Sequence, residues 1–121
     1  MIKSIDHILI AVKNLGESSL QYEKVLGLKP TWRGKHPNLG TENILFPLEN
    51  LYLELIAGTS DGFLADKVND HIKENGESIF GIALEVENIE EVLKSKAYSN
   101  FQNIKITPGE GINLDSGAKR E

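Results

Sequence analysis

The chain has 121 residues, of which 40% are hydrophobic and 26% are charged, a composition typical of one soluble globular domain. The formal net charge of -5 and the absence of a long Lys/Arg run argue against a nucleic-acid or anionic-membrane partner. The chain contains no cysteine, which excludes disulfides and thiolate metal sites and favours a cytoplasmic location. The apolar run near the N-terminus is too short for a signal peptide or a membrane span.

The first predicted strand covers residues 5–12 and is apolar on both faces, which indicates that both faces are covered. Side chains of a strand alternate between its faces, so His7 shares a face with Ile5, Leu9 and Ala11. We therefore expect the His7 imidazole to face an interior or a cavity rather than bulk water.

A helix is predicted directly after this strand. Asn14, with Glu17 three residues later, is typical of a helix N-terminus, and Gly27 is typical of a helix end. The side chains expected to be buried recur at steps of three and four: Leu15, Ser19, Tyr22 and Leu26.

The next segments are predicted to be a short strand around residues 31–33, a loop over residues 35–42 and a tight hairpin of two strands, 43–48 and 51–57. A linker helix follows over residues 61–75. Its expected buried side consists of Phe63, Leu64, Val68 and Ile72.

An internal repeat indicates two related modules. The stretch SIDHILIAVKNLGE (residues 4–17) returns as SIFGIALEVENIEE (residues 78–91), with Gly81 in the place of His7. The second copy predicts a strand over residues 79–86, a helix that begins at Asn88 and ends near Tyr98, and a strand over residues 101–106. We therefore predict an α+β fold in which paired βαβββ modules form a cupped mixed sheet and the second module is incomplete. The expected single domain divides into module one (4–57), the linker helix (61–75) and partial module two (78–121).

His7 and Glu54 are the first candidates for chemistry. Glu54 lies in an apolar strand, and a buried carboxylate without a partner costs several kcal/mol, so a partner is expected. An imidazole and a carboxylate from two strands are a typical start to a divalent-metal site. The alternatives are a buried His7 bonded to the backbone and a solvent-facing Glu54 on an edge strand.

Three stretches together resemble the glyoxalase-like group of the vicinal oxygen chelate superfamily: the Asp-His strand opening, the loop from His36 to Asn43, and the YLEL strand. The resemblance extends from Ile5 to about Ile106. It implies a cupped sheet of paired modules and a divalent metal, and it places the first-module ligands on His7 and Glu54. The second histidine position of the family falls on Gly81, and its second carboxylate position would lie beyond Glu121.

The resemblance implies a metal-dependent lyase, isomerase or dioxygenase that acts on a small oxygen-rich substrate. Glu54 is the candidate catalytic residue, and His36 is the alternative group for moving a proton. Zn, Mn, Ni and Fe suit a His–Glu pair about equally, although this chain offers an incomplete ligand set. Two alternatives stay open: a non-catalytic protein that binds or sequesters a small molecule, and a truncated portion of a longer glyoxalase-like protein.

The loop around RGKHPNLGTEN and its flanks are predicted to bind the small-molecule ligand. His36, Thr41 and Asn43 supply polar groups, and Trp32 and Arg33 would add an aromatic wall and an anion clamp. Gly34 and Gly40 would let the backbone approach a ligand closely. A plain polar turn and a core-packed Trp32 are the alternatives. His71 is expected to face solvent.

An incomplete second module would leave an open strand edge and an apolar face. Such an edge favours association, so we predict a homodimer.

Overall fold

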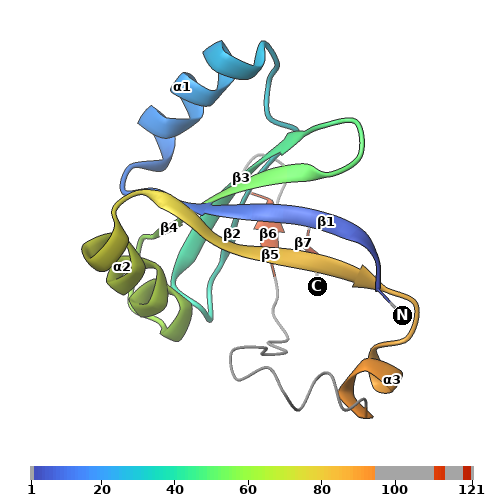
Figure 1. Ribbon diagram of the computed structural model, residues 1–121. Coiled ribbons are helices and arrows are strands. Elements are labelled where there is room, and N and C mark those ends of the chain that lie inside the picture. Colours follow the sequence, from blue (N-terminus) through green and yellow to red (C-terminus); the bar gives the residue numbers. More distant parts are fainter. Residues whose placement is uncertain (1, 95–110, 114–118, 121) are drawn as a thin grey trace.

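The computed structural model describes residues 2–94, 111–113 and 119–120. Figure 1 shows a curved sheet with helix α1 on one side and helix α2 near one end. The elements are β1 (Ile2–Ala11), α1 (Leu15–Leu26), β2 (Trp32–His36), β3 (Thr41–Pro47), β4 (Tyr52–Gly58), α2 (Phe63–Asn75), β5 (Ser78–Val86), α3 (Ile89–Lys94), β6 (Gly111–Asn113) and β7 (Lys119–Arg120).

The described strands form one mixed sheet in the order β5-β1-β4-β3-β2-β6-β7. β1 is parallel to β4 and antiparallel to β5, and the other neighbours are antiparallel. The two modules therefore meet along their first strands, β1 and β5. This α+β sheet of paired modules confirms the predicted fold class.

The helix boundaries follow from the capping residues that the sequence offers. The Asn14 side chain accepts a hydrogen bond from the Glu17 backbone N–H at 2.9 Å, and α1 ends at Gly27 with a φ of 70°. Asn88 likewise accepts from the Glu90 backbone N–H at 2.9 Å at the start of α3. Within the described residues α3 ends at Lys94; the expected helix end near Tyr98 and the strand over residues 101–106 lie outside them.

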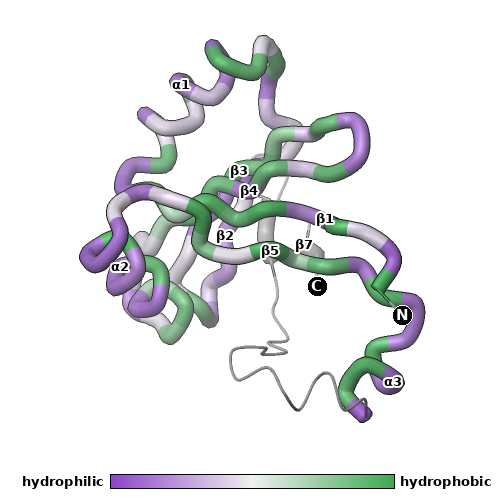
Figure 2. Tube along the Cα trace, in the orientation of Figure 1, coloured by the Kyte–Doolittle hydropathy of each residue, from purple (hydrophilic) through white to green (hydrophobic). Residues whose placement is uncertain are grey.

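One face of the sheet packs against α1. Its buried residues are Val12, Ile44, Phe46, Leu55 and Ala57, and the side chains that pack on them include Leu15, Tyr22 and Leu26. Figure 2 shows that the central strands carry much of the apolar sequence, whereas the helices alternate between polar and apolar residues. The predicted buried side of α1 is confirmed, with Ser19 only 8% exposed.

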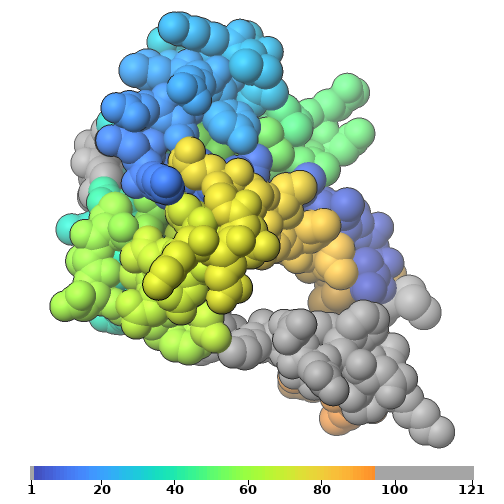
Figure 3. Space-filling model, turned by 60° about the vertical axis from the view of Figure 1, so that its left-hand side comes forward, coloured from blue at the N-terminus to red at the C-terminus, as the bar shows by residue number. Residues whose placement is uncertain are grey.

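The opposite face of the sheet packs against α2 near the ends of β1 and β4. Ala11, Ile56, Val68 and Ile72 form this second cluster. Phe63 was predicted to be buried and is instead 53% exposed, with the Lys67 ammonium 5.5 Å from its ring centroid. Residues 65, 68 and 72 are three and four positions apart, so they lie on one side of α2, and this side faces the sheet. Ala65 is therefore buried, whereas Phe63, the first residue of the helix, lies on a different side. Figure 3 shows α1 and α2 on the outside of the molecule, with β5 beside the start of β1.

The segment after β2 is a short turn rather than the predicted eight-residue loop. β2 extends to His36 and β3 begins at Thr41, and the backbone N–H groups of Leu39 and Gly40 donate to the His36 carbonyl. The Leu39 carbonyl accepts from the Ala65 N–H in the first turn of α2, and the Gly40 carbonyl accepts from Thr59 and Ser60. The turn therefore holds the start of α2.

Gly40 has a structural reason to be glycine. Its φ is 75°, and an added Cβ would lie 2.5 Å from the Ser60 carbonyl oxygen. The close backbone approach that the sequence suggested is an approach to the protein's own chain.

Candidate functional site

One face of the sheet gathers most of the predicted site residues. Directly paired residues of neighbouring strands project to the same side, so the β-ladder registers determine which side chains share a face. The pairs Leu9↔Glu54, Glu54↔Leu45 and Leu45↔Trp32 join β1, β4, β3 and β2. We call this surface the site face; its polar and aromatic residues are His7, Trp32, His36, Thr41, Asn43, Tyr52 and Glu54.

Arg33 is the exception among the predicted site residues. It pairs with Ile44, which packs under α1, so Arg33 belongs to the opposite face, where it is exposed. Adjacent residues of a regular strand point to opposite sides, so Trp32 and Arg33 cannot both face one ligand from β2. The structure brings Trp32 to the site face and does not bring Arg33 there.

His7 and Glu54 meet as the sequence predicted. The His7 Nε2 and Glu54 Oε1 atoms are 3.6 Å apart, and the two side chains are 18% and 9% exposed. This distance is too long for a hydrogen bond. Among the described residues no hydrogen bond to the Glu54 carboxylate is found, so His7 is the group it faces. Glu54 is therefore largely buried, with its carboxylate at ion-pair distance from the His7 imidazole.

The His7 ring is held on its other sides by two side chains. Its Nδ1 lies 2.7 Å from the Asp6 Oδ2, and its ring stacks on Tyr52 with centroids 4.6 Å apart and an interplanar angle of 14°. A carboxylate can only accept, so the Nδ1 carries the hydrogen of that bond. The Nε2 atom, on the other side of the ring, faces the Glu54 carboxylate.

The donor chemistry of His7 and Glu54 fits part of a divalent-metal site. An imidazole nitrogen and a carboxylate oxygen, each about 2.1 Å from one metal ion, lie roughly 3.0–3.5 Å from each other, close to the observed 3.6 Å. Within the described residues, however, no group of three or more His, Cys, Asp or Glu side chains could hold a metal. The pair alone therefore offers two candidate ligands, fewer than the three protein ligands of a typical catalytic metal site.

Gly81 lies on the site face, paired with Leu9, which in turn pairs with Glu54. From β5, Gly81 pairs with Leu9 on β1, and among the described residues beyond its chain neighbours an added Cβ would meet the Leu9 Cδ1, at 3.9 Å. That contact is ordinary van der Waals contact. The second module therefore presents an open position on the site face where the first module carries an imidazole.

Trp32 and Asn43 form a second polar unit on the site face. The Trp32 Nε1–H donates to the Asn43 Oδ1 at 3.3 Å, and Asn43 is only 4% exposed. Trp32 is partly buried, so its ring can serve as a wall while its N–H is satisfied. The sequence singled out both residues but could not pair them, because their register was not known.

His36 and Thr41 form a third unit at the far end of β2 and β3. The His36 Nδ1 lies 3.1 Å from the hydroxyl oxygen of Thr41, which is 1% exposed. Together with Lys35, Pro37, Glu42, Thr59 and Ser60 they line a cavity of about 260 Å³. This cavity is lined in part by the segment for which the sequence predicted ligand binding.

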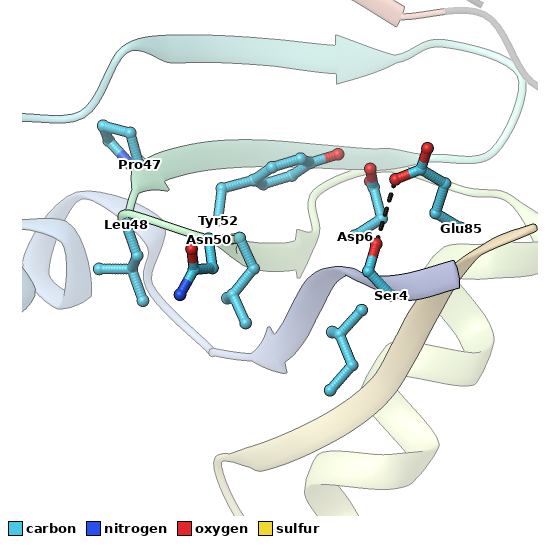
Figure 4. Close-up of a pocket in the computed structure, with 9 residues that line it drawn as sticks. Ser4, Asp6, Pro47, Leu48, Asn50, Tyr52 and Glu85 are labelled. Carbon is cyan, nitrogen blue, oxygen red and sulfur yellow. Dashed lines mark hydrogen bonds between the residues drawn. The ribbon is translucent and has the colours of Figure 1, made fainter. Parts of the chain in front are cut away.

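A cavity of about 270 Å³ at the other end of the sheet was not predicted (Figure 4). Its lining includes Asp6, Tyr52 and Glu85, and the Ser4 hydroxyl donates to Glu85 at 3.1 Å. Asp6 and Tyr52 are also the two side chains that hold the His7 ring. The Asp-His dipeptide was the available signal, but regular alternation would have placed Asp6 on the face away from His7.

His71 does not face solvent as expected. It is partly buried, its Nε2 lies 2.8 Å from the Ser78 Oγ, and its ring meets Phe80 edge-on at 5.4 Å. The Ser78 hydroxyl donates to the Gly76 carbonyl, so the serine proton is already engaged. The unit joins the end of α2 to β5 and is structural.

The fold and the paired site residues define the class of protein. A mixed sheet of two modules joined along their first strands, with a His–Glu pair on one face, is the arrangement of the vicinal oxygen chelate fold. Residues 5–117 match the family model for the glyoxalase-like domain, so the chain belongs to the glyoxalase-like domain family. No curated protein matches the chain.

Several solved structures share this fold. A variant of Streptomyces coelicolor methylmalonyl-CoA epimerase in complex with 2-nitronate-propionyl-CoA superposes with a TM-score of 0.71 at 16% identity, covering 93% of this chain and 85% of that one. A hypothetical protein from Bacillus halodurans gives 0.71 at 22% identity, with coverages of 93% and 85%. Methylmalonyl-CoA epimerase from Mycobacterium tuberculosis gives 0.69 at 14% identity, with coverages of 98% and 85%.

No helix among the described residues has the length and apolar content needed to cross a membrane.

Proposed function

We propose that this protein is a divalent-metal-dependent isomerase that acts on a small, oxygen-rich substrate. The observation that carries the proposal is the buried Glu54, whose side chain is 9% exposed and whose carboxylate faces the His7 Nε2 at 3.6 Å. A buried carboxylate is costly unless a cation or a hydrogen bond compensates it. A divalent cation held by His7 and Glu54 would supply that compensation.

In this proposal His7 and Glu54 hold the metal, and Zn, Mn, Ni and Fe(II) all suit such ligands. The ion, when bound, polarises the oxygen atoms of the substrate as a Lewis acid. Trp32 and Asn43 form a wall for the substrate, and His36 and Thr41 bind its distal end. Glu54 and His36 are the two candidate proton-transfer groups on this face, with Glu54 as the catalytic candidate nearer the metal.

The solved structures of the same fold suggest which substrates to test first. Several are methylmalonyl-CoA epimerases, one of them in complex with methylmalonyl-CoA. Epimerisation requires a proton to leave and return at one carbon atom, and a buried carboxylate suits that task. Short branched acyl-CoA thioesters are therefore the first class to assay, by solvent deuterium incorporation, with lyase and dioxygenase assays next.

The test of the proposal is the metal content of tag-free protein after incubation with each of the four metals. We expect close to one metal ion per chain in the wild type and loss of metal in His7→Ala, because one ligand is removed. His71→Gln is the matched control, since it removes a histidine bonded to Ser78 rather than one facing Glu54. Equal metal content in all three proteins would overturn the assignment of the site to His7.

A non-catalytic binding protein is the second candidate. It is supported by the absence of a three-ligand group within the described residues and by Gly81 in the place of a second histidine. In this case the site face holds a small molecule without chemistry. An absence of metal from the wild type under all four conditions would favour this reading over the isomerase.

We also propose that the protein is a cytoplasmic homodimer. β5 is the outermost strand on its side of the described sheet, and three of its large apolar side chains are about half exposed: Ile79 (59%), Ile82 (55%) and Leu84 (49%). Exposed apolar edge strands favour pairing with another chain.

Light scattering coupled to size exclusion should therefore give the mass of two chains at micromolar concentration. Ile82→Lys, which places a charge on this edge, should shift the population toward monomer, whereas Val25→Lys on α1, 83% exposed, should not. A monomeric wild type at that concentration would contradict the proposal.

A further inference from the structure

The contact between Asp6 and His7 requires a local irregularity of β1. Neighbouring residues of a regular strand point to opposite faces, yet the Asp6 Oδ2 lies 2.7 Å from the His7 Nδ1. The register of β1 with β5 shifts at this point, because Ile5 pairs with Leu84 while His7 pairs with Ala83. Asp6 is the extra residue of a β-bulge, and such bulges re-aim side chains.

The bulge leaves the two ring nitrogens of His7 with different partners. The Asp6 carboxylate accepts from Nδ1, and Nε2 faces the Glu54 carboxylate at a distance beyond hydrogen bonding. The Tyr52 ring stacks on the imidazole and limits its rotation. The Asp6 side chain is 46% exposed and lines the cavity of about 270 Å³ that Figure 4 shows, so its charge is partly solvated.

We propose that Asp6 is a positioning residue that fixes the His7 tautomer and presents Nε2 as a ligand toward Glu54. This inference rests on the proposed function, in which His7 holds a metal. Carboxylates that accept from the second nitrogen of a ligating histidine orient the ring and raise its basicity, and their loss costs about 10–100-fold in metal affinity. In this role Asp6 would act through His7 and would not itself be a ligand.

The first test is the tautomer of His7 in metal-free protein, read from ¹⁵N chemical shifts at a pH where the ring is neutral. The wild type should show hydrogen on Nδ1. Asp6→Ala should shift His7 toward the Nε2–H form, which is the more common one in free imidazole side chains. Asp6→Asn keeps an acceptor oxygen at this position and should retain the Nδ1–H form.

The second test is the affinity for Zn²⁺ and Mn²⁺ by calorimetry. Asp6→Ala should bind about 10–100-fold more weakly than the wild type, and Asp6→Asn should fall between the two. Glu85→Gln is the matched control: it removes a carboxylate from the same cavity, where Glu85 pairs with Ser4 and Lys3 and not with His7. Its affinity should stay within about twofold of the wild type.

The two readouts separate this inference from the proposed function. An unchanged tautomer in Asp6→Ala overturns the positioning role, whatever the metal affinity. A shifted tautomer in a protein whose wild type binds neither metal supports the role of Asp6 at His7 and contradicts the metal function. If Asp6→Ala and Glu85→Gln weaken metal binding equally, the effect is one of general charge, and the positioning role is again overturned.

Discussion

Gly81→His should bind divalent metal more tightly than the wild type, by about tenfold or more, because it adds a third protein ligand to His7 and Glu54. Position 81 on β5 pairs with Leu9, and position 83 pairs with His7, so positions 7 and 81 are diagonal neighbours across an antiparallel pair. Diagonal neighbours are about 7 Å apart, a separation that two imidazoles can bridge through one metal ion.

The backbone at Gly81 can accept the new side chain. In the part of the chain that the structure describes, chain neighbours aside, the atom found within 4 Å of an added Cβ is the Leu9 Cδ1, at 3.9 Å, and Gly81 has no positive φ. The imidazole would lie on the face that Leu9 shares with Glu54. We therefore expect the variant to fold and its gain in affinity to come from coordination.

Ile82→His provides the control, because it adds a histidine to the same strand at an exposed position paired with Ile8, on the other face. Calorimetric titration with Zn²⁺ should distinguish the two variants. The gain should also vanish when His7→Ala is combined with Gly81→His. Equal Zn²⁺ affinities for Gly81→His and Ile82→His would show that a side chain at position 81 does not share a metal ion with His7 and Glu54.

The sequence predicted those features of the site that depend on regular alternation and on capping residues. The meeting of His7 and Glu54 followed from two strands with definite faces, and the limits of α1 followed from Asn14 and Gly27. The repeat placed Gly81 on the second module, and the structure pairs it with Leu9 on the first. Each of these features can be recognised from residues close together in the sequence, or from a second copy of such a stretch.

The features that the sequence did not predict depend on register. Asp6 reaches His7 only because β1 bulges against β5, and a bulge has no clear mark in a single sequence. The pairing of Trp32 with Asn43 depends on how β2 aligns with β3. Gly40 appeared suited to a ligand because a glycine that accommodates a ligand and one that accommodates a neighbouring turn look alike in sequence.

Glu54→Leu should abolish metal binding and stabilise the metal-free protein, by about 1–3 kcal/mol. Glu54 is 7% exposed, and its paired neighbours on either side are Leu9 and the buried Leu45. A leucine at this position would extend that apolar row. Replacing a buried charged group by an apolar side chain of similar volume is commonly neutral or stabilising, because the desolvation cost of the charge disappears.

Urea denaturation without metal measures the expected gain in the free energy of unfolding. Glu54→Gln is the control that separates charge from shape, because it removes the charge but keeps the volume and hydrogen-bonding capacity of the side chain. Adding Zn²⁺ at about 100 times its dissociation constant should stabilise the wild type by about 2.7 kcal/mol and leave Glu54→Leu unchanged. The stability difference between the two proteins should therefore narrow or reverse with metal. A Glu54→Leu protein that is less stable than the wild type without metal would mean that the fold itself requires the carboxylate.

Glu54→Leu is expected to stabilise the metal-free protein but to abolish metal binding, and this contrast indicates why a carboxylate is present at position 54. A residue that costs stability in the metal-free fold and is compensated only when a cation binds is expected at a functional site and not in a purely structural core. Glu54 lies in the centre of the sheet, where an apolar side chain would serve packing better. If Glu54→Leu stabilises the metal-free protein and abolishes metal binding, the stability lost through the carboxylate is linked to metal binding. If Glu54→Leu stabilises the protein but the wild type binds no metal, the result favours the second candidate, a non-catalytic binding protein.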